Sequence, residues 1–283
     1  MRALIVTGDD FGLAVEVNEA IEAAHERGIL TTASLMVGAA AAQDAVERAR
    51  RRPQLRVGLH LVLVEGRPVM PPAEVSALVD DAGEFPTDLV RAGIRFFFLR
   101  RVRQQLEKEI TAQFEAFRRT GLALDHVNAH NHMHLHPTIL GLILKIGRRY
   151  GMRAVRVPYE PLGLVRDVPA GAALTRFATW LFLAPWVAGV RRRLRRAHIL
   201  HNDFIVGLSD SGRMHTTRVL QLLRRVPNGV TEMYFHPSTS RCPELDRRMP
   251  TYQHRSEFDA LINPEVMAAV QAGGLQRIAF ADL

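Results

Sequence analysis

The sequence predicts an α/β fold, most economically a single (β/α) barrel or a distorted relative of one. Three observations predict it. The 283 residues are 47% apolar and 23% charged, a composition typical of globular domains. Short β-rich segments alternate with helix-like segments along the whole chain, which is the pattern of parallel βα units. Neither a composition break nor an internal repeat divides the chain, so we expect one domain over residues 1–283. A doubly wound open sheet is the alternative.

The predicted strands are short runs rich in branched and aromatic apolar residues. In chain order they are Leu4–Thr7, Ala33–Val37, Val57–Val62, Ala123–Asn128, Ala154–Val157, Phe204–Leu208, Thr231–Phe235 and Arg277–Phe280. About eight strands of this kind are what a (β/α) barrel requires, and the carboxyl ends of its strands meet on one face.

Helix-like segments separate the strands. They are Ala14–Glu26, Ala39–Arg51, Val102–Thr120, Thr138–Tyr150, Thr216–Arg225 and Pro264–Ala272. Several boundaries carry signals of their own. Gly121 follows a helix that ends in arginines, Pro137 suits a first helical turn, and Asn263 is a candidate N-cap.

Composition excludes several classes of protein. No run of about 18 apolar residues without a charge exists, so no transmembrane helix is predicted. The N-terminus reads MRALIVTGDD, without a signal peptide, and we expect a cytoplasmic protein. Cys242 is the only cysteine, which excludes an internal disulfide and a cysteine-rich zinc site. The net charge of +8 fits either an anionic partner or a genome rich in arginine codons, so charge does not decide the function. The sequence does not predict an oligomeric state.

Two segments combine aromatic apolar residues with clustered arginines. Ile94–Leu99 reads IRFFFL and precedes further arginines, and Phe177–Val190 reads FATWLFLAPWVAGV and runs into Arg191–Arg196. The second lies in an apolar-basic insertion around residues 173–200. Both are too short to span a bilayer. Such segments are typical of peripheral contact with an anionic membrane, and the alternative is a barrel helix that packs its apolar side inward.

The acid pair Asp9-Asp10 follows the first predicted strand. Adjacent carboxylates at a strand end allow one to bind a metal while the other accepts a proton. The alternative role is an N-cap and a first-turn acid of the next helix. His60 ends another strand, and taken alone it would be a buried structural histidine.

The segment Leu124–Pro137, LDHVNAHNHMHLHP, carries five of the twelve histidines. They are His126, His130, His132, His134 and His136. Alternate residues of a strand share a face, so several imidazoles can point into one cavity. Imidazole is the commonest metal ligand among side chains, and this density predicts a metal site. A catalytic zinc ion takes about three protein ligands, so not all five bind it.

Two further strand ends carry polar residues. Arg156 precedes Val157-Pro158-Tyr159, and His236 follows the strand TEMYF. An arginine at such a position can orient a carboxylate, and a histidine can donate a proton. In a barrel all these strand ends converge, so we expect one site.

These motifs resemble the YdjC/ChbG family of carbohydrate deacetylases, distant relatives of the NodB-type polysaccharide deacetylases. The resemblance is carried by VTGDDFGL, VGLHLVL, LDHVNAHNHMHLHP and YFHP, which span Thr7 to Pro237. Within the family, GLHLVLVEGRPVMPP, IRFFFLRR and AVRVPYEP look like the hopanoid-biosynthesis-associated HpnK branch. The fold implied is a (β/α) barrel of the polysaccharide-deacetylase type.

The resemblance also implies roles for individual residues. It implies that Asp10, His60 and His130 bind a divalent metal. It implies that Asp9 is the general base, with Arg156 beside it, and that His236 is the general acid.

The remaining expectations concern the substrate. We expect His132, His134, Tyr159, Phe97 and Trp180 to contact it. Asn128 stands where the family usually has an aspartate.

The implied reaction removes the acetyl group from an N-acetylglucosaminyl hopanoid, a glycolipid, at a peripheral membrane position. We expect zinc as the metal, with magnesium as the alternative. The competing function is deacetylation of soluble N-acetylated oligosaccharides such as chitooligosaccharides. A nucleic-acid-binding protein is disfavoured, because no nucleic-acid motif accompanies the positive charge.

Overall fold

One parallel sheet organises the computed structural model, which describes residues 2–161 and 184–283. Its strands are β1 Arg2–Phe11, β2 Thr32–Leu35, β3 Arg56–Leu61, β4 Leu124–Ala129, β5 Phe204–Val206, β6 Gly229–Phe235 and β7 Gln276–Ile278. The strand order is β4-β3-β2-β1-β6-β5, and β7 pairs with β1. All the pairings are parallel, so the carboxyl ends of the strands lie at the same end of the sheet.

The sheet curls, and irregular hydrogen bonds continue it from β4 toward β5. Val127 on β4 forms a parallel bridge with Val155, and Ala154 forms another with Leu200, shortly before β5. Residues 154–157 therefore occupy a strand position in the ring without forming a regular strand. This arrangement is a distorted (β/α) barrel, as the sequence predicts, and its least regular part is the predicted strand Ala154–Val157.

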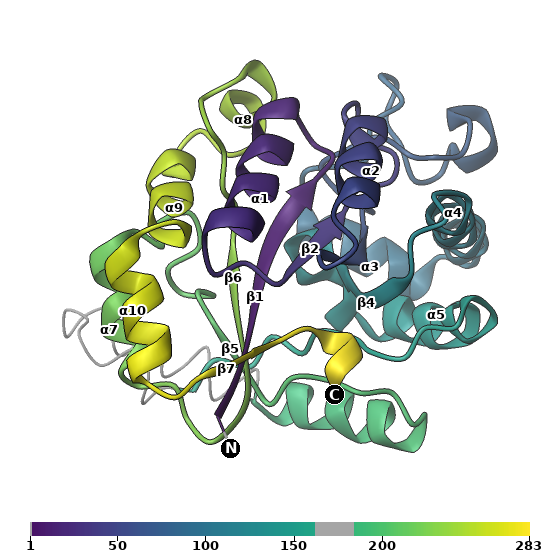
Figure 1. Cartoon of the computed structure of the whole chain (residues 1–283). Helices are drawn as coiled ribbons and strands as arrows, with labels where there is room; N and C mark the ends of the chain where they lie inside the picture. Colours follow the sequence, from purple (N-terminus) through teal and green to yellow (C-terminus); the bar gives the residue numbers. More distant parts are fainter. Residues whose placement is uncertain (1, 162–183) are drawn as a thin grey trace, which may run out of the picture.

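Helices lie around the outside of the curled sheet (Figure 1). They are α1 Val15–Arg27, α2 Ala42–Arg51, α3 Leu89–Phe98, α4 Arg100–Arg119, α5 Pro137–Gly147, α7 Thr216–Leu223, α8 Pro243–Arg248, α9 His254–Leu261 and α10 Pro264–Ala272. Residues 184–196 are helical as well. Short 3-10 turns lie at Pro72–Val75, His130–Leu135, Arg148–Tyr150 and Phe280–Asp282. Within the described residues, no helix is long and apolar enough to cross a membrane.

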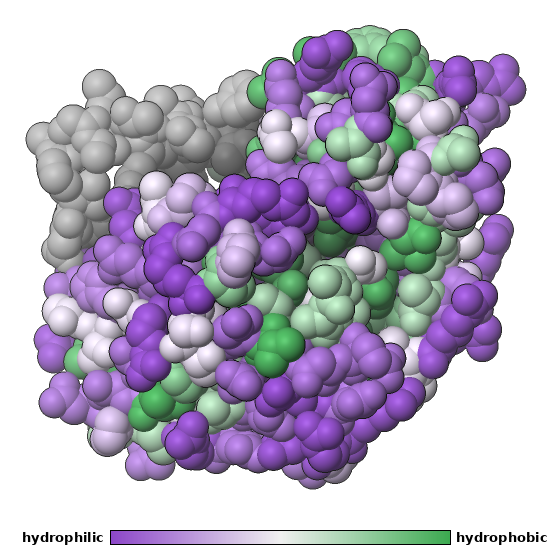
Figure 2. Space-filling model, turned by 90° about the horizontal axis from the view of Figure 1, so that it is seen from above, coloured by the Kyte–Doolittle hydropathy of each residue, from purple (hydrophilic) through white to green (hydrophobic). Residues whose placement is uncertain are grey.

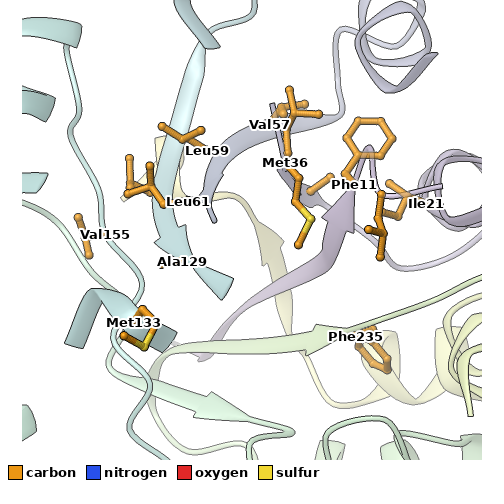
Figure 3. Close-up of a cluster of buried hydrophobic side chains, with 14 of the residues drawn as sticks. Phe11, Ile21, Met36, Val57, Leu59, Leu61, Ala129, Met133, Val155 and Phe235 are labelled. Carbon is orange, nitrogen blue, oxygen red and sulfur yellow. The ribbon is translucent and has the colours of Figure 1, made fainter. Parts of the chain in front are cut away.

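β1 lies at the centre of the sheet and is buried from Ala3 to Phe11. It can be apolar on both faces because helices cover it outside and neighbouring strands enclose it inside. The core between sheet and helices includes Phe11, Ile21 and Leu59, which belong to one cluster of buried apolar side chains (Figure 3). The site described below is therefore built on a buried central strand.

Most predicted elements are confirmed, with boundaries shifted by a few residues. Seven of the eight predicted strands and all six predicted helices have counterparts among the described elements. The segments not expected as helices are α3, α8 and α9. In α3, apolar residues lie on both faces, because Ala92 and Phe96 are buried while other large apolar side chains are exposed. That pattern hides the helical period on which sequence analysis depends.

Candidate active site

The acid pair lies inside β1, near its carboxyl end, rather than after the strand. Neighbouring residues of a regular strand point to opposite faces, which would separate Asp9 from Asp10. The β1–β2 register shifts between Gly8 and Phe11, and Asp10 has a left-handed φ of 61°. This bulge brings both carboxylates to the same site.

Asp10, His60 and His130 form a buried group with the composition of a metal site. Asp10 Oδ1 lies 3.3 Å from His60 Nε2 and 3.4 Å from His130 Nδ1. One donor atom from each residue lies within 4.8 Å of the other two. They come from β1, β3 and the turn after β4, and β2 lies between β1 and β3 in the sheet.

The donor atoms of this group lack other partners. Both Asp10 carboxylate oxygens and His60 Nε2 are buried without a hydrogen bond. An unpaired buried carboxylate is costly, and a bound cation would remove that cost. The residues therefore fit a divalent metal ion, and Asp10, His60 and His130 are the side chains that can hold it.

Arg156 is fully buried between two carboxylates. It donates to Asp9 Oδ2 at 2.6 Å and Oδ1 at 2.9 Å, and to Glu232 Oε1 at 2.7 Å. Burial raises the pKa of Asp9, but the Arg156 guanidinium outweighs it and holds that pKa well below the ordinary value. Asp9 is thus ionised and oriented, as expected of a carboxylate beside an arginine.

His236 follows β6 and lies on the same face. Its backbone N–H donates to Glu257 Oε2 at 2.6 Å, and its ring packs edge-on against Tyr234 and Tyr252. Burial lowers the pKa of His236, while the charges of Asp10 and Asp9 act in the opposite direction. The ring is therefore neutral at pH 7 and able to take up a proton when negative charge develops beside it.

Several of these groups line one cavity of about 380 Å³. Its walls include Asp9, His60, His130, His132, His236 and Tyr252. Seen from above, toward the strand ends, this face of the molecule carries a hollowed band of apolar residues bordered by hydrophilic ones (Figure 2). A cavity of this size accommodates a sugar residue and its amide substituent.

The histidine-rich segment does not continue as a strand beyond Ala129. It turns sharply at His130–Leu135, where Asn131 and His132 have left-handed φ values of 50° and 53°. The turn, rather than strand alternation, brings His130 to Asp10 and places His132 against Tyr234. His126 stays within the sheet, where its ring packs so closely on Gly58 that a Cβ there would lie 2.4 Å from it.

The predicted substrate contacts fall in different places. His132 lines the cavity, and its buried Nδ1 has no hydrogen-bond partner. His134 is fully buried, and both ring nitrogens lie 3.1 Å from backbone groups, Ala129 N and Arg156 O. Neither nitrogen is available to a substrate, so its role here is to hold the turn against the strand.

Tyr159 and Phe97 also lie outside the residues that line the cavity. Tyr159 packs against Phe204 and under the Arg191 guanidinium, 4.6 Å from it. Phe97 lies on α3 and is 48% exposed. Trp180 lies outside the described residues.

Three residues at the site were not singled out in the sequence. Glu232 is fully buried and binds Arg156, Glu65 lies 3.5 Å from His130 Nε2, and Tyr252 lines the cavity. A signal existed for Glu232, because an acid inside the apolar strand VTEMYF needs a buried partner. Glu65 and Tyr252 lie on connecting segments, where the sequence carries no comparable signal.

An exposed apolar helix face lies next to the cavity. On α3, Val90 is 74%, Ile94 56% and Phe98 69% exposed, and these residues are spaced as one face of a helix. Leu89, at the start of α3, lines the cavity itself. The apolar face of α3 thus continues into the wall of the site.

Comparisons with known proteins identify the family. The family model described as YdjC-like protein matches residues 3–272. A carbohydrate deacetylase of Geobacillus stearothermophilus is 30% identical over 99% of this chain and 98% of its own length. A human carbohydrate deacetylase is 33% identical over 99% of this chain and 90% of its own length.

A solved structure supports the fold. The crystal structure of an Enterococcus faecalis V583 protein superposes with a TM-score of 0.74 at 23% identity, over 99% of this chain and 98% of that one. The family rests on the sequence: the family model matches nearly the whole chain, and the Geobacillus stearothermophilus relative is 30% identical over almost its full length, so the chain belongs to the YdjC-like family.

Proposed function

We propose that this protein is a metal-dependent carbohydrate deacetylase that removes an N-acetyl group from an amino sugar. The observation that supports it most is the placement of the buried group Asp10, His60 and His130 at the cavity that His60, His130, Asp9 and His236 line. Relatives similar over nearly their whole length are named carbohydrate deacetylases.

Amide hydrolysis needs an activated water, a stabilised oxyanion and a protonated leaving amine. A divalent metal held by Asp10, His60 and His130 would supply polarisation of the carbonyl and a lowered pKa of water. Asp9 takes the water proton, and Arg156 keeps its carboxylate ionised and aimed. His236 takes up a proton from solvent as the oxyanion develops and passes it to the sugar nitrogen, because an amide anion is a very poor leaving group, and Asp9 releases the water proton to solvent.

We propose zinc as the metal, with magnesium as the alternative. The donor set is two imidazoles and one carboxylate, which suits zinc. Magnesium prefers a shell made of oxygen atoms, including several waters.

We propose an N-acetylglucosaminyl hopanoid as the substrate. The sequence resemblance to the hopanoid-associated branch suggests it, and the α3 face supports it. A hopanoid is a rigid apolar body, and a helix face with Val90, Ile94 and Phe98 exposed offers such a body an apolar path. Leu89 joins this face to the cavity that would hold the sugar.

We further propose that the protein acts as a peripheral protein on the inner face of the membrane. Arg91, Arg100 and Arg103 are exposed beside the apolar residues of α3. Arginines around an apolar face are the pattern of segments that lie on anionic lipid, where each adds about 1 kcal/mol of attraction.

The test compares two substrates and one chelator treatment. Purified protein is assayed for acetate release from N-acetylglucosaminyl hopanoid in anionic vesicles and from soluble chitooligosaccharides. We expect release from the lipid, abolished by chelation and restored by zinc. Release from soluble sugars alone would retain the deacetylase and replace the lipid substrate by the oligosaccharide alternative. Release from neither substrate by protein loaded with metal would contradict the proposed function.

A further inference from the structure

The two histidines of the metal group turn different ring nitrogens toward Asp10. His60 presents Nε2, at 3.3 Å from Asp10 Oδ1, and His130 presents Nδ1, at 3.4 Å from the same oxygen. The rings are nearly perpendicular, at 76°, with their centres 5.7 Å apart. The outward nitrogen is therefore Nδ1 in His60 and Nε2 in His130, and each meets a different neighbour.

The outward nitrogen of His130 faces a carboxylate. His130 Nε2 lies 3.5 Å from Glu65 Oε2, and Asn131 Nδ2 donates to that same oxygen at 2.8 Å. The backbones of Glu65 and Asn131 are both left-handed, with φ values of 51° and 50°. Such conformations are sparsely populated for residues other than glycine, and the fold maintains two of them to hold this pair together.

The outward nitrogen of His60 faces an amide. One end of the Asn128 amide lies 2.7 Å from His60 Nδ1. Its other end lies 2.9 Å from Ser34 Oγ and 3.0 Å and 3.1 Å from the two terminal nitrogens of Arg156. Arg156 offers N–H groups, and so does His60 when its proton is on Nδ1. A single amide oxygen can serve only one of these two sides. The orientation that satisfies both ends turns the oxygen to Ser34 and Arg156 and the amide N–H to His60 Nδ1, whereas a metal on Nε2 of His60 requires the opposite orientation.

A histidine that binds a metal through one nitrogen carries its proton on the other. The partner of that proton fixes the tautomer and the ring orientation. We propose that Glu65 and Asn128 are positioning residues for the metal site: Glu65 keeps Nδ1 of His130 free for the ion, and Asn128 keeps Nε2 of His60 free. The ion is then held through opposite nitrogens of the two rings.

The two positioning residues contribute unequally. Glu65 is charged, and a carboxylate that accepts the imidazole proton raises the basicity of the ligating nitrogen. Asn128 is neutral, and its oxygen must be turned away from Arg156 to accept the proton of His60. Glu65 therefore supplies the larger part of the support, although it lies on a connecting segment and does not contact the ion.

The first test measures zinc affinity by competition with a chelator, in the whole protein and without substrate. We expect Glu65→Leu to weaken zinc binding about 10- to 100-fold, the usual effect of removing such a partner. Glu65→Gln keeps a hydrogen-bond acceptor without the charge, so its affinity should lie between those of Glu65→Leu and the unmodified protein. Glu74→Gln, an exposed acid on a neighbouring turn, serves as the control and should change nothing.

The second measurement identifies the nitrogens directly. Protein with ¹⁵N-labelled histidine is loaded with zinc, and long-range proton–nitrogen spectra report which ring nitrogen carries the proton. We expect the proton on Nε2 of His130 and on Nδ1 of His60. Zinc bound through the same nitrogen in both rings would overturn the proposal, and this test needs no variant to fold.

A role in substrate contact gives a different result. If Glu65 served only the sugar, Glu65→Gln would raise KM while leaving zinc affinity unchanged, which would overturn the positioning role. The inference rests on the proposed metal site and not on the proposed substrate. Failure to find a lipid substrate therefore leaves the zinc measurements intact, and failure of the zinc measurements leaves the substrate assay intact.

Discussion

The strand-end site and the exposed face of α3 lie side by side and are built in opposite ways. At the site, charged side chains are buried: Asp9, Arg156 and Glu232 are at most 2% exposed. On α3, apolar side chains are exposed, and Phe98 is 69% open to solvent. Leu89 belongs to both, since it starts α3 and lines the cavity.

The difference shows how each region obtains its stability. The buried charges remain charged because Arg156 joins two carboxylates and every guanidinium contact is short. The apolar face of α3 contributes little to folding, since water still covers it. The exposed apolar face of α3 thus adds little to the stability of the fold and lies beside the cavity. An exposed apolar face of this kind is typical of a surface that binds an apolar partner.

The largest effect is expected for Asp10→Ala, which removes the only carboxylate of the metal group. Metal binding and acetate release should both be lost, because two imidazoles alone leave too few ligands. Asp9→Asn is the matched variant and should keep the metal while losing activity. Metal content and turnover of the two proteins decide the matter, and equal metal loss in both would mean that the two aspartates share one role.

Arg156→Leu tests the buried charges. It leaves Asp9 and Glu232 buried without their cation, and we expect a loss of about 3–5 kcal/mol in the free energy of unfolding. Urea denaturation measures this loss. Arg255→Leu, which removes an exposed arginine paired with Asp259, should change stability by less than about 1 kcal/mol. Similar small losses for both arginines would contradict the structural role of Arg156.

His236→Ala separates catalysis from metal binding at the site. We expect acetate release to fall about 100- to 10,000-fold, the usual contribution of a positioned proton donor, with metal content unchanged. Turnover near that of the unmodified protein would show that another group protonates the amine.

The buried carboxyl group of Glu257, which contacts the backbone of His236, makes the free energy of unfolding depend on pH. Burial raises its pKa from 4.5 to about 7, and the backbone N–H groups of His236 and Met214, which lower this pKa by hydrogen bonding, only partly offset the effect. Because the pKa of Glu257 is higher in the folded than in the unfolded state, binding of its proton stabilises the folded state. This contribution to the free energy of unfolding is complete below pH 4.5 and is lost as pH rises through about 7. The protein should therefore lose on the order of 3 kcal/mol between these two pH values from this group. Denaturation at pH 5 and pH 8 measures the loss, and Glu257→Gln should reduce it. An equal pH dependence in the variant would contradict this assignment.

The smallest effect on stability is expected on α3. Phe98→Ala should change the free energy of unfolding by no more than about 0.5 kcal/mol, because its ring is already exposed. Phe96→Ala, on the opposite face of the same helix and 2% exposed, should cost about 3–5 kcal/mol. Phe98→Ala should also weaken binding to anionic vesicles while sparing a soluble substrate. Unchanged vesicle binding would remove α3 from the proposed membrane surface.

Much of the fold could be predicted because its signals are local. The strand LIVTG and its neighbours are buried runs, and helices such as Ala14–Glu26 carry clear periodicity. The predicted strand Ala154–Val157 forms only isolated bridges, because the local pattern does not report how the sheet closes. α3 was not predicted because apolar residues lie on both of its faces, which hides the helical period in the sequence.

The site was predictable in part for a related reason. Parallel strands end on one face, so polar residues at those ends are expected to meet, and Asp10, His60 and His130 do meet. His134 belongs to the same histidine run, but the turn after Ala129 directs it into backbone contacts instead. A local sequence pattern cannot distinguish these two outcomes.

The sequence by itself determined the βα alternation, the strand ends and the types of polar residue at those ends, because these depend on neighbours along the chain. Only the tertiary structure decided which nitrogen each histidine presents, that Glu232 shares Arg156 with Asp9, and that α3 buries Phe96 while it exposes Phe97 and Phe98. Those features depend on a bulge in β1, a left-handed turn after β4 and segments distant in sequence. Their energies arise from contacts that exist only after the sheet has curled and brought the strand ends together.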